Sequence, residues 1–404
     1  MKIFKKTPLT LALSVAIVGL SVSNVTQAES ITEALTSGKA SVNNLLRYES
    51  VEQDNAAKDA SALTLRTLLA YKTGTIKGFS ATVEMEDSRI VMGQGDYTVG
   101  PTGYNVGEYS VIADPEHTEL DQGFIQYTGS GLTAKLGRQV ITMDGHRFIG
   151  HVGWRQDRQT FDGLSVRYAP SEALTLNYAY IDQRNRIFAE SADLDAKDHL
   201  LNASYMTPVG KITAYGYLLE VDNGTENSLD TYGVSFTGST AAGDAKILYA
   251  AEYASQSNET STTDFSTDYM NLSVGVVVSG ITAKLGYESL GSDEGGVGFA
   301  TPLATLHKFN GWADMFLGTP NEGLVDTSVT LAGKVLGGSW TVMYHDFEAD
   351  EATATVDDLG SELDLSYVKS YGKHYSAGIK YAAYSGEGTR VDTDKLWVWV
   401  GAKF

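Results

Sequence analysis

The sequence predicts an all-β fold, a transmembrane antiparallel up-and-down β-barrel of about 18 strands. Segments that alternate apolar and polar side chains recur along most of the chain. The connections between these segments are short and long in turn. The chain also opens with a segment typical of exported proteins. Together these three features indicate a barrel that closes within the outer membrane of a Gram-negative cell.

Composition excludes several other classes of protein. The chain has 404 residues, with 30 Lys and Arg against 50 Asp and Glu, for a formal net charge of −20. Because phosphate backbones need a basic face, we expect no nucleic-acid partner. The absence of cysteine from the sequence excludes a disulfide scaffold, a thiolate metal site and a cysteine nucleophile.

The first residues have the three parts of a secretory signal peptide. Lys2, Lys5 and Lys6 form a basic start, an apolar run covers residues 9–22, and small residues lead up to Ala28. We expect cleavage near Ala28, so residues 1–28 are the signal peptide and residues 29–404 a single outer-membrane barrel domain. The apolar run is too short for a membrane anchor helix.

The remaining chain has a period of two residues. Met270, Leu272 and Val274, for example, are separated by polar or small residues, which predicts a strand with one apolar face. The predicted strands cover residues 40–50, 61–73, 75–86, 119–128, 131–141, 159–169, 173–183, 198–207, 209–221, 229–238, 244–256, 267–279, 280–290, 325–336, 338–348, 360–369, 373–384 and 393–404.

The lengths of the predicted connections support a membrane barrel over a soluble β-sandwich. Short turns lie at 129–131, 279–280 and 337–338, among other places. The long connections are 87–118, 142–158, 184–197, 257–266 and 291–324. Outer-membrane barrels have short periplasmic turns and long extracellular loops. About eighteen strands leave an aqueous channel rather than a core filled by side chains.

The last predicted strand places Leu396, Val398, Val400, Ala402 and Phe404 on one face and ends on an aromatic residue. This arrangement resembles the C-terminal signal by which outer-membrane barrels are recognised. We therefore expect the barrel-assembly machinery to be a partner through Phe404. Outer-membrane lipid and lipopolysaccharide are the other expected partners of the barrel wall.

Arginine is concentrated in one part of the chain. Seven of the eleven arginines lie between 138 and 186, where no lysine occurs. The arginine fork matches carboxylates, so this cluster predicts a constriction that selects anions. The alternative is that Arg–Asp pairs fix an infolded loop to the wall. The candidate residues are Arg138, Arg147, Arg155, Arg158, Arg167, Arg184 and Arg186, with Asp157 and Asp162.

Strict alternation places Arg138 on the lipid side, so its presence in the constriction requires a bulge or a rim position near Gly137. The same alternation predicts further basic side chains in the lumen, which are Arg47, Arg66, Lys135, Lys284, Lys334 and Lys380.

The connection at 291–324 is a candidate gate. Its central stretch includes His307, Trp312 and Asp314 and is too apolar to extend into water. We expect it to pack inward or against neighbouring loops.

Five segments carry a family resemblance. They are Gly137-Arg138-Gln139, Arg147-Phe148-Ile149-Gly150-His151-Val152-Gly153-Trp154-Arg155-Gln156, Gln159-Thr160-Phe161-Asp162-Gly163, Tyr180 to Phe188, and Leu306-His307-Lys308-Phe309-Asn310-Gly311-Trp312-Ala313-Asp314. With these segments the chain resembles the alginate-export porin family of marine gammaproteobacterial type. The resemblance implies an eighteen-stranded barrel whose arginine-lined constriction passes an anionic uronate polysaccharide. That role would fall to Arg138, Arg155, Arg158 and Arg167.

We therefore expect an outer-membrane porin, not an enzyme, that forms a water-filled channel for passive passage of small or oligomeric solutes. A preference for anionic, uronate-type saccharides is expected, and both export and uptake fit. One alternative is a plugged barrel with a structural or adhesive role. The other is a hydrolase at the rim, for which His345 beside Asp346 is a weak pair because adjacent strand residues face opposite ways. No catalytic residue, cofactor or metal is implied.

Overall fold

The computed structural model describes residues 27–55, 57–93, 95–100, 105–353 and 356–404. The predicted signal peptide, residues 1–28, lies outside this part except for its last two residues, so its cleavage stays a prediction. None of the helices in the described ranges has the length and hydrophobicity needed to cross a bilayer.

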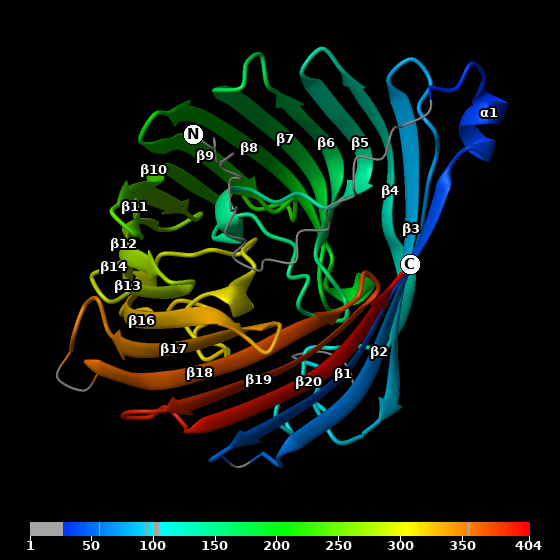
Figure 1. The fold of residues 1–404 in the computed structure, drawn as a ribbon. Coiled ribbons are helices and arrows are strands. Elements are labelled where there is room, and N and C mark those ends of the chain that lie inside the picture. Colours follow the sequence, from blue (N-terminus) through cyan, green and yellow to red (C-terminus); the bar gives the residue numbers. More distant parts are fainter. Residues whose placement is uncertain (1–26, 56, 94, 101–104, 354–355) are drawn as a thin grey trace, which may run out of the picture.

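The chain forms one 18-stranded antiparallel sheet that is rolled into a barrel (Figure 1). Every predicted strand is present, with ends that differ by a few residues. The strands are β1 (Lys39–Gln53), β2 (Ala60–Lys72), β3 (Phe79–Met92), β4 (His117–Gly129), β5 (Leu132–Gln139), β6 (Thr160–Tyr168), β7 (Leu174–Asn185), β8 (Leu194–Thr207), β9 (Gly210–Glu220), β10 (Ser228–Ala242), β11 (Ala245–Glu259), β12 (Asp264–Val278), β13 (Ile281–Leu290), β16 (Leu324–Val335), β17 (Gly338–Glu348), β18 (Asp358–Tyr371), β19 (Tyr375–Ser385) and β20 (Thr393–Lys403).

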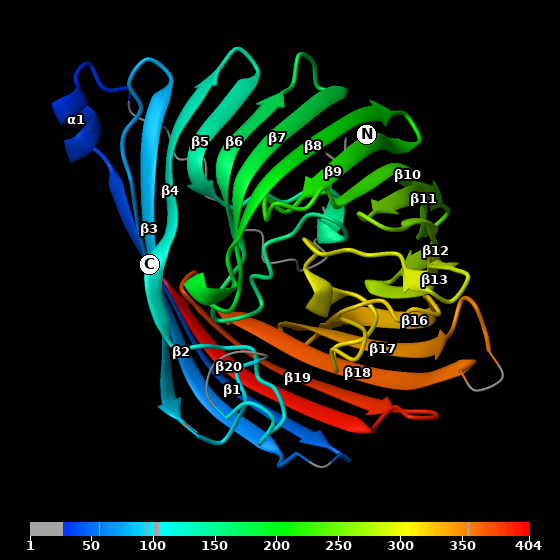
Figure 2. The same cartoon turned by 180° about the vertical axis from the view of Figure 1, so that it is seen from behind.

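The first strand closes the barrel. β1 pairs with β2 on one side and with β20 on the other, so that Arg47 lies opposite both Thr64 and Trp399. Figure 2 shows β20 and β1 side by side from behind. Closure satisfies the backbone groups that an open edge would expose to lipid, where no water can replace the missing partner.

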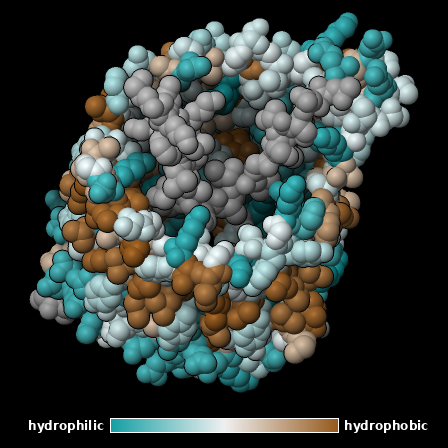
Figure 3. Space-filling view, in the orientation of Figure 1, coloured by the Kyte–Doolittle hydropathy of each residue, from teal (hydrophilic) through white to brown (hydrophobic). Residues whose placement is uncertain are grey.

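The two faces of the wall differ as the alternation predicts. On β12 the side chains of Met270, Leu272, Val274 and Val278 are exposed on the outer face. Figure 3 shows hydrophobic side chains gathered in a broad band over the near side of the outer wall. The opposite parity carries polar and charged side chains into the lumen, and Glu49 of β1 is one that is buried there.

The connections have the predicted two-sided pattern, with two corrections. The connection predicted at 184–197 covers only residues 186–193. At one end of the barrel the turns are short, as at 130–131, 208–209 and 336–337, while the other end carries the connections 93–116, 140–159 and 291–323. The connection predicted at 257–266 is shorter than expected. β11 and β12 continue to pair as far as Glu259 and Asp264, and Thr260 and Thr263 close the turn.

Short elements lie outside the barrel sheet. Helix α1 (Ile31–Thr36) is capped by Ser30, packs beside the β2–β3 turn and buries Ala34. β14 (Ser292–Asp293) and β15 (Val297–Gly298) form a two-stranded sheet within the 291–323 connection. The 3-10 turns are η1 (Asp144–His146), η2 (Glu190–Ala192) and η3 (Leu306–Lys308).

Two long connections fold into the barrel and supply much of its core. In Figure 1 the blue-green segment after β5 and the yellow segment after β13 lie within the ring of strands. Phe148 of the first packs against Tyr215 and Tyr269 of the wall and against Phe299 of the second. The core of this barrel therefore lies where the two loops meet the inner wall. We call residues 140–159 the first infolded loop and residues 291–323 the second infolded loop.

Candidate functional site

The two infolded loops are joined through their backbones. Gly150 N–H donates to the Leu303 carbonyl at 2.7 Å, and Thr305 N–H donates to the His146 carbonyl at 3.0 Å. The side-chain amide of Gln159 also donates to the Leu303 carbonyl, at 3.2 Å. These bonds make the loops a single unit inside the lumen.

The predicted gate residues lie at the centre of this unit. The His307 ring stacks on Trp154, with centroids 5.0 Å apart. His307 Nδ1 is 2.7 Å from Asp314 Oδ1, and its Nε2 is 2.8 Å from Lys380 Nζ. Trp312 has the Lys380 ammonium 3.8 Å from its ring centre. The second infolded loop thus packs inward, as its apolar composition predicts.

Burial is the main determinant of the protonation state of His307, and Asp314 opposes its effect on the pKa. Burial lowers the pKa of His307 to about 3, and the Lys380 ammonium adds to this effect. The neutral ring can donate from Nδ1 to Asp314 and accept at Nε2 from Lys380. Burial opposes ionisation of Asp314, but His307, Lys395 and Arg155 together hold its pKa well below the usual range.

Arg155 joins the first infolded loop to the wall and to the second loop. Its guanidinium contacts Glu49 of β1 at 2.9 Å and Asp314 at 3.0 Å. The side chain is almost fully buried. Both carboxylates are therefore close enough to neutralise it, and little of its fork is left for a solute.

Two wall arginines fix the backbone of the first loop. Arg47 donates to the Trp154 carbonyl and also pairs with Asp114 of the 93–116 connection. Arg66 donates to the Arg155 carbonyl at 2.8 Å. Both face the lumen, as predicted, and both contact protein groups there.

Three more of the predicted arginines have buried carboxylate partners. Arg158 contacts Asp121 of β4 at 2.9 Å and also pairs with Glu84 of β3. Arg147 contacts Glu288 of β13 at 2.8 Å. Arg184 pairs bidentately with Asp198 of β8, at 2.6 and 2.8 Å.

The other candidates of the 138–186 region lie in different surroundings. Arg186 donates to the Gln159 side chain at 2.5 Å and to the Pro302 carbonyl at 3.0 Å, so it too joins the infolded loops. Asp157 pairs with no lysine or arginine of the described residues and lies instead beside His117.

Arg138 does not join the lumen arginines. β5 pairs in unbroken register with β4 from Leu132 to Arg138 and with β6 from Leu132 to Gln139, so this described strand has no bulge near Gly137. Arg138 lies one residue before the end of the strand, near the long connections. Arg138 therefore keeps the parity of the exposed Leu136, opposite to Lys135. It pairs there with Asp162 at 2.8 Å.

A cavity of about 430 Å³ lies between the first infolded loop and the inner wall of β5–β9. Its basic lining residues are Lys135, Arg167 and Lys211. Lys211 pairs with Asp144 at 3.0 Å. In the described part of the chain, no carboxylate lies within ion-pair distance of Lys135 or Arg167, and Arg167 is exposed to the cavity.

The remaining predicted lumen lysines are either buried or exposed. Lys380 is buried against His307 and Trp312. Lys284 shares the lumen parity of Glu288 and is exposed. Lys334, near a short turn, shares the lumen parity of Asp326 and is also exposed. None of these three lysines forms an ion pair with a carboxylate in the described ranges.

Sequence reasoning missed the partners that decide which cations are free. Asp121, Asp198 and Lys211 were not singled out, although each falls within a predicted strand. Their signal was weak, since a strand position gives the face of a side chain but not which residue of an infolded loop or neighbouring strand contacts it. His345, which the sequence placed beside Asp346, has a different carboxylate partner in the structure. It contacts Asp326 of the neighbouring strand at 2.8 Å.

A closed barrel of antiparallel strands, apolar outside and charged inside, with long loops folded into the lumen, is the architecture of an outer-membrane porin. Solved structures with this fold include Pseudomonas aeruginosa OccK9 (OpdG), at a TM-score of 0.73 and 15% identity over 92% of this chain and 99% of that one. Acinetobacter baumannii OccAB4 aligns at a TM-score of 0.71 and 14% identity over 92% of this chain and 99% of that one. Pseudomonas aeruginosa OpdK, solved with vanillate, aligns at a TM-score of 0.71 and 13% identity over 91% of this chain and 98% of that one.

The sequence model of the alginate export family matches residues 32–288, which is more than half of the chain. The protein therefore belongs to the alginate export family. No curated protein matches it.

Proposed function

We propose that the protein is a passive outer-membrane channel that prefers small or oligomeric anionic solutes, uronate-type saccharides in particular. The observation that carries the proposal is the lumen cavity with Lys135 and Arg167, whose charges no carboxylate of the described residues neutralises. A free guanidinium can bind a uronate carboxylate through two parallel hydrogen bonds. Membership of the alginate export family supports the same class of solute.

The partners of the arginines indicate where in the lumen the solute is selected. Arg147, Arg155 and Arg158 lie in the first infolded loop and each has a buried carboxylate partner, which supports the role of loop fixation. Arg184 pairs instead with Asp198 across two neighbouring wall strands. Since the charge of these four arginines is locally compensated, they attract a passing anion less than an unpaired cation does. We assign the contact with solute to Lys135 and Arg167.

The test is a measurement of ion selectivity in a planar bilayer. Purified protein is inserted and the reversal potential is recorded in a KCl gradient, with and without uronate oligosaccharide. We expect chloride preference and current block by uronate in the wild type, and loss of both in the K135Q/R167Q variant. The K58Q/K197Q variant removes the same charge from exposed lysines outside the cavity and should behave as the wild type. Potassium preference and indifference to uronate would contradict the proposal.

A second candidate is a plugged barrel with a structural or adhesive role. The two infolded loops favour it, because they bond to each other and to the wall in the middle of the lumen. This candidate predicts no conductance steps from folded protein under any salt condition. Steady conductance would exclude it.

The route to the membrane is part of the same proposal. We infer export through the signal peptide at 1–28, with cleavage near Ala28, and recognition by the barrel-assembly machinery through Phe404. The Phe404 side chain is exposed at the end of β20 and stacks on His374 with centroids 5.1 Å apart. A Phe404→Ser variant should slow assembly in cells without preventing refolding in detergent, as a gel assay of folded barrel can measure.

A further inference from the structure

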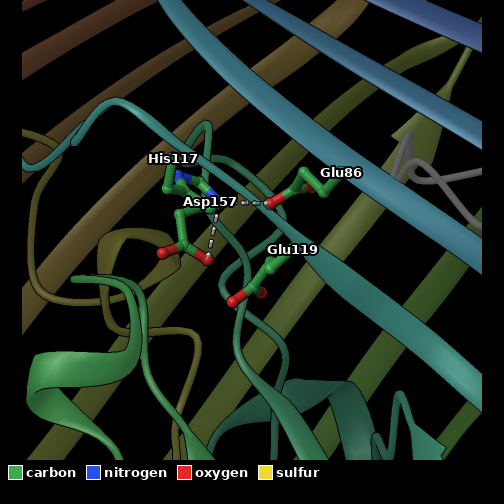
Figure 4. A group of neighbouring side chains, drawn as sticks. All are labelled: Glu86, His117, Glu119 and Asp157. Atoms are coloured by element: carbon green, nitrogen blue, oxygen red, sulfur yellow. Dashed lines mark ion pairs between the residues drawn. The ribbon is translucent and has the colours of Figure 1, made fainter.

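Four side chains that the channel function does not use converge at one point of the inner wall. They are Glu86 of β3, His117 and Glu119 of β4, and Asp157 of the first infolded loop. One ligand atom from each lies within 4.8 Å of those of the others. Figure 4 shows the imidazole and the carboxylates pointing toward one another.

This placement leaves negative charge uncompensated. Glu86 and Glu119 lie directly opposite each other in the β3–β4 pairing, where like charges are unfavourable. Glu86 and Asp157 are fully buried. No lysine or arginine of the described ranges forms an ion pair with any of the three carboxylates, since the nearby Arg158 is engaged by Asp121 and Glu84. Among the described residues, His117 is the one basic side chain within ion-pair distance of Glu86 and Asp157.

Each of three side chains is held by one atom and leaves another atom unpartnered. Glu86 Oε1 accepts from the Arg158 backbone at 3.3 Å, and Asp157 Oδ2 accepts from Ala189 N–H at 3.0 Å. His117 Nδ1 lies 3.4 Å from the Pro115 carbonyl. Glu86 Oε2, His117 Nε2 and Asp157 Oδ1 are buried without a hydrogen-bond partner. Buried polar atoms of this kind need an explanation, and an ion is one of them.

The distances within the cluster suit ligands of a common ion. His117 Nε2 is 3.5 Å from Glu86 Oε1 and 3.7 Å from Asp157 Oδ1. These separations are longer than a charge-assisted hydrogen bond of about 2.8 Å. Ligand atoms at about 2.0–2.1 Å from a tetrahedral metal are about 3.3–3.5 Å apart. The backbone contact at His117 Nδ1 is also the usual way in which a ligating imidazole is oriented.

We propose that Glu86, His117, Glu119 and Asp157 bind a divalent transition metal ion. A donor set of one imidazole and three carboxylates, without thiolate, suits Zn²⁺ and its neighbours, whereas Ca²⁺ prefers oxygen ligands alone.

The location gives the ion a structural task. Its ligands come from two wall strands and from the loop that carries Arg155 and Arg158. The ion would therefore fasten the first infolded loop to β3 and β4, beside the pairs of Arg158 with Asp121 and Glu84. It would supply the positive charge that the wall lacks at this point.

The test uses the full barrel, free of any affinity tag, refolded in detergent without lipopolysaccharide and treated with EDTA. ZnCl₂ is titrated in a calorimeter, and the metal content after desalting is measured by mass spectrometry. We expect one Zn²⁺ per chain and a higher unfolding temperature in its presence. Both effects should disappear in H117Q and E119Q and persist in H199Q, which removes an exposed histidine elsewhere.

A gel assay of folded barrel checks each variant, and E119Q carries the test if H117Q fails to fold, because Glu119 is only half-buried. Absence of saturable Zn²⁺ binding by the wild type would overturn the proposal. So would binding that survives in folded H117Q or E119Q. Tight Ca²⁺ binding with weak Zn²⁺ binding would overturn the assignment to a transition metal.

Discussion

The imidazole of His307 lies nearly parallel to the indole of Trp154, with 6° between the ring planes. The two residues belong to different connections, 140–159 and 291–323, and meet inside the barrel. Trp154 also meets Trp399 of the wall edge-on, at 5.3 Å between centroids. This contact, together with the backbone bonds between the loops, means that neither loop can leave the lumen without disturbing the other.

Loss of the Arg155 guanidinium should loosen this unit. In R155M, Glu49 keeps Arg47 at 3.4 Å and Asp314 keeps Lys395 at 2.9 Å, so neither carboxylate is left wholly alone. We expect a loss of about 3 kcal/mol in unfolding free energy, the lower end of the effect of breaking a buried pair. Urea unfolding of the refolded barrel measures it. R89M, which removes an exposed partner of Asp87, should cost about 0–1 kcal/mol. An R155M loss no larger than that of R89M would contradict the role assigned to Arg155.

Acid should release the second infolded loop. His307 has a pKa of about 3 in the folded protein and about 6.5 when unfolded. Between these two values the unfolded chain binds a proton at His307 and the folded chain does not. The stability from neutral His307 is therefore complete above about pH 6.5 and is lost as pH falls toward its folded pKa. The lowered pKa of Asp314 acts in the same direction below about pH 4.

The measurement is the pH dependence of single-channel conductance and of urea unfolding. We expect larger or noisier openings and lower stability as pH falls from 7 to 4 in the wild type. H307Q keeps groups that can bond Asp314 and Lys380 but does not titrate, so it should remove the part of the change above about pH 4. A variant curve that matches the wild-type curve would refute the role of His307.

Gly311 should be sensitive to a methyl group for two separate reasons. Its φ of +84° is unfavourable for other residues, and an added Cβ would overlap the carboxylate of Glu362. That carboxylate accepts from Ala313 N–H at 2.7 Å, so moving it would free a buried donor. Gly295 in the same loop has a φ of +72° and open space around it. We expect G295A to cost about 1–2 kcal/mol and G311A to cost about 1–3 kcal/mol more, measured by urea unfolding. Equal losses would mean that Glu362 does not hold the loop.

The strands were predictable because their signal is local. Alternation over a few residues, as in Met270, Leu272 and Val274, is enough to place a strand and its faces, and the turn residues mark its ends. The connection at 257–266 was predicted too long because Ser257 and Ser266 give no apolar signal, yet they pair across β11 and β12. Pairing of polar strand ends depends on the partner strand, which a local pattern does not record.

The candidate site was predictable in composition but not in its division of roles. The arginine cluster marked the infolded loop, and the interpretation of Arg–acid pairs fixing that loop fits Arg155 and Arg158. Their partners Glu49 and Asp121 come from strands distant in sequence, so no local signal separates a fixed arginine from a free one. His117 belongs to a His-x-Glu pattern on a strand, which places two donors on one face. That pattern was the available signal for the proposed metal site.

The lumen cavity should make block by uronate depend on the side of addition, if the proposed function holds. Thr133, Arg167 and Lys211 lie near the turns 130–131, 169–173 and 208–209, so the cavity lies toward the end of the barrel with short turns. Residues 140–144 of the first infolded loop, which enters from the end with long connections, also line the cavity. An anion that enters from the short-turn side therefore reaches Lys135 and Arg167 without passing the loops.

We expect uronate oligosaccharide to block with an association rate about tenfold higher from the short-turn side at low salt, because unpaired cations steer anions toward them. The difference should fade in about 1 M salt, where charges are screened. Since the sequence contains no cysteine, a K373C substitution in the short turn at 372–374 lets a thiol reagent report the orientation of each inserted channel. In this background K135Q/R167Q should abolish the asymmetry and K58Q/K197Q should preserve it. Equal block from both sides in the K373C protein alone would place solute recognition elsewhere in the lumen.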